Sequence, residues 1–229
     1  MALRRRARRA DARRLEILRA AARVFRKRGF SAAGMREIAE EADLSPGNLY
    51  HYFKGKDRIL YFCQDRSLDV MMEALQAARA SEEPALIRLQ RVIEAHVRCL
   101  LDKMEGSAAH LEVDALPPRL RAKIVAKRDR YERGIRRLIA SGARRGELAP
   151  CDATLVTRAI LGAANWTARW FKPEGPRSAT AVARALGEHV VRGLDGRMVA
   201  LADDGTRHRE RHRAQLSTRA KMMRSYGRH

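Results

Sequence analysis

A short segment, residues 35–56, carries the side chains best suited to contact another molecule. Asn48 and His51 lie three positions apart, so they share one face of a helix, with Tyr52 beside them. An asparagine amide can form two hydrogen bonds with adenine, and a histidine ring can donate to guanine or to a phosphate. Side chains of these types on an exposed helix predict contact with DNA.

Two short helices and a tight turn must position these side chains. Apolar residues repeat with helical spacing over residues 35–42, and the pattern breaks at residues 43–45. Ser45 and Pro46 give a typical helix start, a hydroxyl cap followed by proline at the first helical position. Leu49 and Phe53 are expected to pack back against the first helix. The pattern predicts a helix-turn-helix, whose second helix enters the major groove.

The charge of the chain favours DNA binding over an ordinary helical hairpin, which the same spacing allows. The formal net charge is +21 and the sequence pI is about 11.1, which indicates a polyanionic partner. Residues 1–14 contain seven arginines and one aspartate, and residues 203–229 contain eight lysines and arginines and three acidic residues. We expect both ends to be mobile arms that add salt-dependent affinity for phosphates. A purely solubilising tail is the alternative at the C-terminus.

Several other classes of protein do not fit the sequence. No apolar run approaches the ~20 residues of a membrane-spanning helix, and the three cysteines fit neither a disulfide framework nor a zinc site. There is no glycine-rich phosphate loop, nucleophile elbow, HExxH or CxxC pattern. Cys99 and His96 could form a thiolate pair, but an apolar-striped helix indicates core packing instead. We therefore expect a cytoplasmic protein that is not an enzyme and has no cofactor.

A metal site is also not expected. His110, Glu112 and Asp114 alternate along the chain, and this pattern invites a metal hypothesis. Spacing of two on a helix does not bring all three side chains together, so the sequence predicts no metal ion.

Helical periodicity with turn punctuation runs throughout the chain, and no strand pattern appears, so the predicted fold is all-α. We expect an N-terminal three-helix DNA-binding domain joined to a larger C-terminal helical bundle for ligand binding and dimerisation. The predicted boundaries are 1–10 for a basic arm, 11–56 for the DNA-binding domain, 57–199 for the bundle and 200–229 for a disordered basic tail. Helices are expected over residues 11–27, 57–79, 85–104, 119–141, 154–171 and 178–199, with a short element at 107–116.

The last two predicted helices carry small residues and one aromatic along a face, which favours close packing between helices. Two such helices from each subunit would form a four-helix bundle around a two-fold axis, so we expect a homodimer through residues 154–171 and 178–199. The alternative is that these residues pack within one chain. One face of a helix can pack within the chain while another face forms the dimer. The residues of the predicted faces are Leu155, Ala159, Gly162, Ala163 and Trp166 on one helix and Val182, Leu186, His189, Val190 and Gly193 on the other.

Residues 15–60 resemble the DNA-binding domain of the TetR family of transcriptional repressors. The matching runs are Ile17-Leu18-Ala21-Ala22-Phe25 with Gly29-Phe30, Met35-Arg36-Glu37-Ile38-Ala39, Leu44-Ser45-Pro46-Gly47-Asn48-Leu49-Tyr50 and Phe53-Lys54-Gly55-Lys56. The resemblance implies a symmetric dimer that binds a palindromic operator, and an all-helical ligand domain whose ligand releases the DNA. Two positions depart from it. Gly34 lacks the hydroxyl often found there, so the contact of that hydroxyl is either absent or made by Ser31, and Asp43 takes the place of a turn glycine.

The resemblance also assigns roles in DNA binding to individual residues. Arg36 matches a position that contacts guanine or phosphate. Gly47 lets the backbone come close, and Pro46 offers an apolar edge to a thymine methyl group. The positions that match phosphate contacts are Tyr50, Tyr52 and Lys56, with Lys54 as a weaker candidate.

A second resemblance concerns the ligand. Residues 108–112, 127–132 and 162–175 look like TetR members that control lipid, steroid or aromatic-acid breakdown and answer to acyl-coenzyme A thioesters. An apolar pocket with a cationic rim suits such a ligand, because the coenzyme carries phosphates. The expected ligand-binding residues are His110, Arg128, Tyr131, Asn165, Trp166, Arg169 and Trp170. Dimer packing is the alternative for Trp166, and a solvated face is the alternative for the arginines at 128, 130 and 133.

The sequence therefore predicts a dimeric repressor released from its operator by an acyl-coenzyme A. One alternative is a TetR-type regulator of another hydrophobic ligand, as in drug or efflux regulation. Another is a non-specific basic DNA-binding or architectural protein, which would need no ligand-sized helical body.

Overall fold

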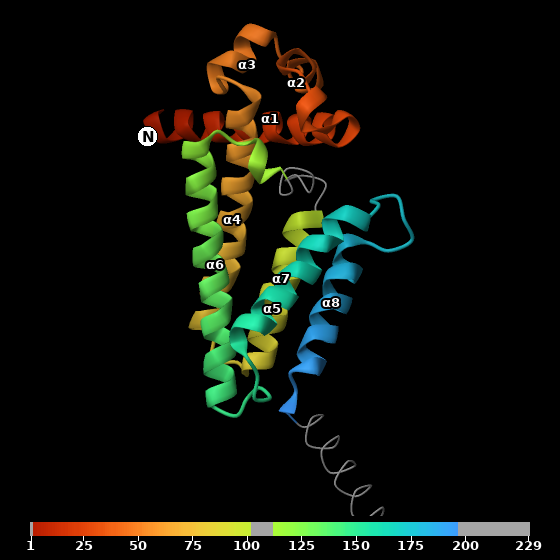
Figure 1. The fold of residues 1–229 in the computed structure, drawn as a ribbon. Helices are drawn as coiled ribbons and strands as arrows, with labels where there is room; N and C mark the ends of the chain where they lie inside the picture. The colour runs from red at the N-terminus through yellow and green to blue at the C-terminus, as the bar shows by residue number, and fades with distance from the viewer. Residues whose placement is uncertain (1, 102–111, 197–229) are drawn as a thin grey trace, which may run out of the picture.

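The computed structural model describes residues 2–101 and 112–196, and the described chain is helical without strands, as predicted (Figure 1). A head of three helices lies across one end of a helical body. The head contains α1 (Ala2–Ala32), α2 (Met35–Glu41) and α3 (Pro46–Tyr52). The body contains α4 (Lys56–Ala80), α5 (Ala85–Leu101), η2 (Val113–Ala115), α6 (Pro118–Arg144), α7 (Ala153–Trp170) and α8 (Ala179–Gly193).

The first helix begins earlier than predicted. It starts at Ala2 rather than Asp11, so the predicted start of the helix is wrong, and the basic segment before residue 11 is helical from residue 2 onward. Alanine and arginine are among the best helix formers, and this composition continues the helix toward the N-terminus. Gly29 interrupts the helix with a φ of 74°, two residues beyond the predicted end at residue 27, and one further turn follows.

The long helix α4 connects the head to the body. Its 25 residues span roughly 37 Å, and α6 lies alongside it for much of that length (Figure 1). A Cβ atom at Gly134 would lie 2.3 Å from Leu75 Cδ2, so any larger residue at this position would require the buried Leu75 side chain to move. The buried core is continuous from the head through α4 into the body.

An ion cluster also joins α6 to α4. Lys127 Nζ lies 2.6 Å from Asp65 Oδ1 and 2.7 Å from Asp69 Oδ1, and it donates to the carbonyl of Asp65 at 2.8 Å. Burial disfavours the ammonium, but the hydrogen bonds to both carboxylates outweigh burial and raise the pKa of Lys127. The cluster therefore fixes α6 against α4 one residue away from Arg128.

Apart from the first helix, the predicted bounds of the helices agree with the observed ones to within a few residues at the ends that the structure describes, except that α8 ends at Gly193, before the predicted end at 199. The predicted end of the helix at residue 104, the start of the element at 107–116 and the tail at 200–229 lie outside the described residues. Across the described ranges, no helix is both long and apolar enough to cross a membrane.

Candidate DNA-binding surface and internal cavity

The start of α3 is set by local hydrogen bonding. Asp43 adopts a left-handed backbone with a φ of 52°, which turns the chain between α2 and α3. Ser45 Oγ accepts a hydrogen bond from the backbone N–H of Asn48 at 3.2 Å, and Pro46 occupies the first helical position. The predicted cap and turn are thus confirmed.

The helix α3 is anchored by its apolar face and exposes its polar face. Leu49 and Phe53 are buried in the head core, as predicted. Tyr52 is half-buried and packs against this core, with its ring edge-on to His51 at 5.7 Å, so the prediction that Tyr52 faces outward is corrected. Its position follows Leu49 by three residues, which places it at the border of the buried face. The exposed residues of the predicted DNA-binding set are Arg36, Ser45, Pro46, Gly47, Asn48, Tyr50, His51 and Lys54.

The start of α2 has no side-chain cap at Gly34. Gly34 is the capping residue, and its backbone N–H donates to Glu37 Oε2 at 3.0 Å. Gly34 has no side chain that could accept a hydrogen bond from within α2, so Glu37 supplies only the reciprocal bond, to the backbone of the capping residue. Arg36 projects from the same helix into solvent, without an ion pair among the described residues.

Lys56 has a structural role that the sequence did not predict. Its ammonium donates to the carbonyls of Phe30, Ser31 and Ala33 at 2.9, 2.7 and 3.1 Å, and it lies 4.9 Å from the centre of the Phe30 ring. All three of its N–H donors are therefore used by the C-terminal end of α1. The predicted phosphate contact is not supported by this geometry, because the ammonium faces the protein backbone.

We expect Lys56→Met to lower the free energy of unfolding by about 1–2 kcal/mol, because it removes charge-assisted hydrogen bonds from a half-exposed site. Urea unfolding followed by circular dichroism measures this change. Lys54→Met is the matched control, because Lys54 is exposed and its substitution removes the same charge. Equal stability of the two variants, with operator affinity lost only in Lys56→Met, would restore the phosphate role.

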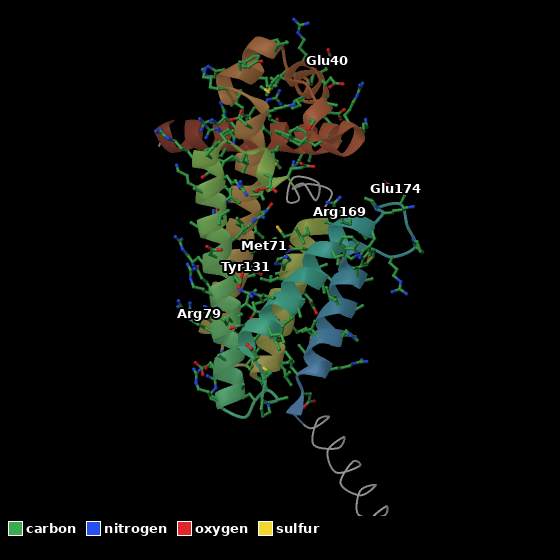
Figure 2. The ribbon with its side chains drawn as sticks, viewed as in Figure 1. Glu40, Met71, Arg79, Tyr131, Arg169 and Glu174 are labelled. Carbon is green, nitrogen blue, oxygen red and sulfur yellow. The ribbon has the colours of Figure 1, made fainter. Side chains whose placement is uncertain are left out.

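A pocket that opens to solvent beside Arg158, Gly162 and Asn165 lies in the body among α4, α5, α6 and α7, and we call it the internal cavity. Its volume is about 460 Å³. Met71 on α4 and Tyr131 on α6 lie in the middle of the body, between the head and the far end (Figure 2). The residues that line it are Leu68, Met71, His96, Leu100, Arg128, Tyr131, Glu132, Arg158, Leu161, Gly162, Asn165 and Ala168.

Three polar side chains from three different helices meet in the cavity wall. His96 Nε2 lies 3.1 Å from Asn165 Oδ1, and His96 Nδ1 lies 3.3 Å from the Tyr131 hydroxyl. The amide oxygen can only accept, so Nε2 carries the proton and Nδ1 accepts from Tyr131. The His96 and Tyr131 rings also stack, with centres 5.6 Å apart. This network holds the imidazole in one orientation against the cavity.

Burial determines the charge states in this wall. It lowers the pKa of His96 to about 4, with a smaller contribution from the positive charge of Arg128, while the hydrogen bond to Asn165 opposes the shift. Burial also raises the pKa of Tyr131 and lowers that of Arg128. At neutral pH the cavity therefore presents an uncharged His96 and Tyr131 beside a partly buried guanidinium.

Only part of the predicted ligand-binding set meets in this cavity. Arg128, Tyr131 and Asn165 line it as predicted. Trp166, Arg169 and Trp170 do not line it. Trp166 follows Asn165 directly and is rotated from it by about 100°, and Trp170 lies four residues further on the same face as Trp166. Arg169 lies four residues beyond Asn165, past the last lining residue of α7, Ala168. Arg169 lies at the end of α7 nearest the head (Figure 2). His110 lies outside the described residues.

The sequence missed several residues of the cavity. His96 was interpreted as core packing, and it is buried, but it also forms part of the cavity wall. Arg158, Leu161 and Gly162 share the face of α7 that holds Asn165, and the spacing of three and four residues could have revealed them. Glu132 follows Tyr131 directly, and its carboxylate lies 4.0 Å from Arg158 Nε.

A second face of α7 is apolar and exposed. Leu155, Trp166 and Trp170 are 66%, 64% and 51% exposed, the small residues at 159 and 163 lie between them, and Gly162 lies at the border with the cavity face. On α8, Val182 is buried, and Gly187 packs against Gln90 and Glu94 of α5, so Val182 belongs to the core of one chain rather than to an open face. Among the described residues, no three histidine, cysteine or acidic side chains form a group that could hold a metal ion.

The arrangement defines a helix-turn-helix head on a helical body with an internal cavity. Two family models match this chain: residues 17–60 match bacterial regulatory proteins of the TetR family, and residues 82–194 match the tetracyclin repressor-like C-terminal domain. The chain belongs to the TetR family of transcriptional regulators.

Individual relatives agree with this assignment. The HTH-type transcriptional repressor KstR2 of Mycolicibacterium smegmatis is 28% identical over 188 residues, which cover 80% of this chain and 90% of the relative. The crystal structure of PfmR, a TetR family regulator of Thermus thermophilus, is 34% identical with a TM-score of 0.70 and covers 77% of this chain and 97% of its own. AibR, solved with isovaleryl coenzyme A and operator DNA, is 23% identical with a TM-score of 0.66 and covers 80% and 98%.

Proposed function

We propose that this protein is a dimeric, cytoplasmic repressor that binds a palindromic operator and is released by an acyl-coenzyme A thioester. The observation that carries the proposal is the connection of two sites by one helix. The exposed face of α3 precedes α4, and α4 supplies Leu68 and Met71 to the internal cavity. A protein that only compacts DNA needs no such cavity. We propose no catalytic role for this protein.

The DNA-binding half of the proposal rests on two copies of α3. One helix of seven residues makes too few base contacts alone, whereas two helices set about 35 Å apart reach successive major grooves. The exposed apolar face of α7 supports a second copy as its occupant, because small residues between large apolar ones allow two helices to approach closely. Asn48, His51 and Arg36 are the proposed base readers, with Tyr50 and Lys54 as phosphate contacts.

We expect His51→Ala or Arg36→Ala to relax the preference for particular base pairs, since a base contact contributes about 1–3 kcal/mol of discrimination. Selection from random DNA, followed by sequencing of the bound pool, measures the preference at each position. Lys54→Ala should weaken all sequences alike and serves as the control. An unchanged binding matrix would remove His51 and Arg36 from the reading set, and failure to enrich any palindrome would favour non-specific binding.

The ligand half of the proposal rests on the chemistry of the cavity wall. Apolar side chains from α4, α5 and α7 suit an acyl chain, and the neutral His96–Asn165 pair can hydrogen-bond a carbonyl oxygen or an amide. Arg128 and Arg158 supply cations for the coenzyme phosphates. The complex of AibR with isovaleryl coenzyme A supports the ligand class as that of a protein with the same fold.

Release follows from coupling between the cavity and the head. Arg128 lies next to Lys127, which is bonded to Asp65 and Asp69 on α4. A ligand that draws Arg128 toward its phosphates therefore pulls on α4, and α4 begins at the Lys56 anchor of the head. A tenfold loss of operator affinity requires about 1.4 kcal/mol of preference for the released conformation.

A further inference from the structure

A second hollow, lined by arginines, lies at the end of the body farthest from α3. It forms where α4 ends, α5 begins and α6 completes its last turns, and its volume is about 370 Å³. We call it the distal arginine hollow. Its lining residues are Arg79, Arg88, Arg137, Leu138, Ala140, Ser141, Arg144 and Arg145.

This hollow is separate from both sites already described. It shares no lining residue with the internal cavity. Arg79 lies low on the body, beyond Tyr131 as seen from the head (Figure 2). Along α4, Arg79 is roughly 35 Å from Lys56, so DNA bound by α3 does not reach it.

The positive charge of the hollow is only partly balanced. Glu147 pairs with Arg145 and lies 3.7 Å from Arg88 Nη2. Its hydrogen bond from Arg145 lowers the pKa of Glu147, so this carboxylate stays ionised at neutral pH. Arg79, Arg137 and Arg144 have no ion pair among the described residues. Three guanidinium groups thus line one hollow without an ion pair of their own, and this concentration of positive charge favours an anion there.

An unsatisfied donor lies in the same wall. The Arg88 side chain is 12% exposed, and its Nε is buried without a hydrogen-bond partner among the described residues. Buried polar groups are nearly always paired, and the exceptions often mark a missing ligand or ion.

We propose that the distal arginine hollow binds a small anion that carries at least two linked phosphate groups. Guanidinium groups present paired N–H donors that match phosphate oxygens, and several of them can share one diphosphate. An inorganic diphosphate and a nucleoside diphosphate share this chemistry, and the hollow is large enough for the diphosphate portion of either.

Isothermal titration of the full chain with pyrophosphate at constant ionic strength tests the proposal. Arg137→Ala combined with Arg144→Ala removes two exposed arginines of the hollow. Arg130→Ala combined with Arg177→Ala removes two exposed arginines elsewhere and is the matched control. We expect one pyrophosphate per chain in the wild type, affinity weaker by about tenfold or more in the first variant, and little change in the control.

Two results would overturn the proposal. Equal loss in both variants would show a general effect of net charge, and no binding by the wild type beyond that of sulfate would show a solvated basic face. Parallel titration with ADP distinguishes the carriers: tighter binding of ADP than of pyrophosphate identifies a nucleotide, and equal binding identifies the diphosphate alone.

Discussion

Lowering the pH from 7 to 4 is expected to destabilise the protein by roughly 3 kcal/mol through His96 alone. The pKa of His96 is about 4 in the folded chain, against an ordinary value of 6.5. Between these values the unfolded chain binds a proton that the folded chain excludes. Stability is therefore complete above pH 6.5 and is lost as the pH falls through the window to about 4. Urea unfolding at a series of pH values measures this slope.

The variant His96→Gln isolates this contribution. Glutamine stays neutral across the window and keeps a donor for Asn165, so the variant should lose much of the pH dependence between 6.5 and 4. Its absolute stability can differ, because the comparison concerns the slope. Parallel pH profiles of the variant and the wild type would show that His96 titrates normally and is not buried in solution.

The second large effect concerns the cations of the internal cavity. Arg128→Met combined with Arg158→Met should weaken the response to an acyl-coenzyme A by about 100-fold, because each charged hydrogen bond to phosphate contributes about 1.5–3 kcal/mol. Operator affinity without ligand should stay near that of the wild type, since neither residue lies in the head. The concentration of thioester that releases half of a labelled operator measures the response.

A matched pair of substitutions controls for net charge. Arg130→Met combined with Arg133→Met removes two exposed arginines of α6 that lie outside the cavity. This variant should respond like the wild type. An equal loss of response in both double variants would show that the phosphates respond to the net positive charge of the body rather than to contacts inside the cavity.

The sequence predicted best those features of the fold that depend on interactions between residues close together in the chain. The cap at Ser45, the left-handed turn at Asp43 and the buried pair Leu49 and Phe53 all depend on residues within one or two helical turns. Propensity and spacing describe such interactions well. The all-α fold and the head were predicted for the same reason.

Long-range contacts were not predictable in this way. Lys56 bonds carbonyls 23 to 26 positions earlier in the chain, and His96 bonds partners 35 and 69 positions later. No local pattern encodes such pairings, so Lys56 was assigned to phosphate and His96 to the core. On α7 the amphipathic pattern indicated two faces, but only packing shows which face lines the cavity. The N-terminal arginines were interpreted from their charge, whereas their helix propensity determined their backbone.

The most direct test of the proposed mechanism is ligand-dependent operator release by the purified full chain. A labelled palindrome, chosen by selection from random DNA, would be titrated with a panel of acyl-coenzyme A thioesters, with the free acids and free coenzyme A as controls. Release by at least one thioester, at concentrations where its acid and the free coenzyme have no effect, is the result that we predict. Operator binding that is indifferent to the whole panel would contradict the proposed ligand class while leaving DNA binding intact.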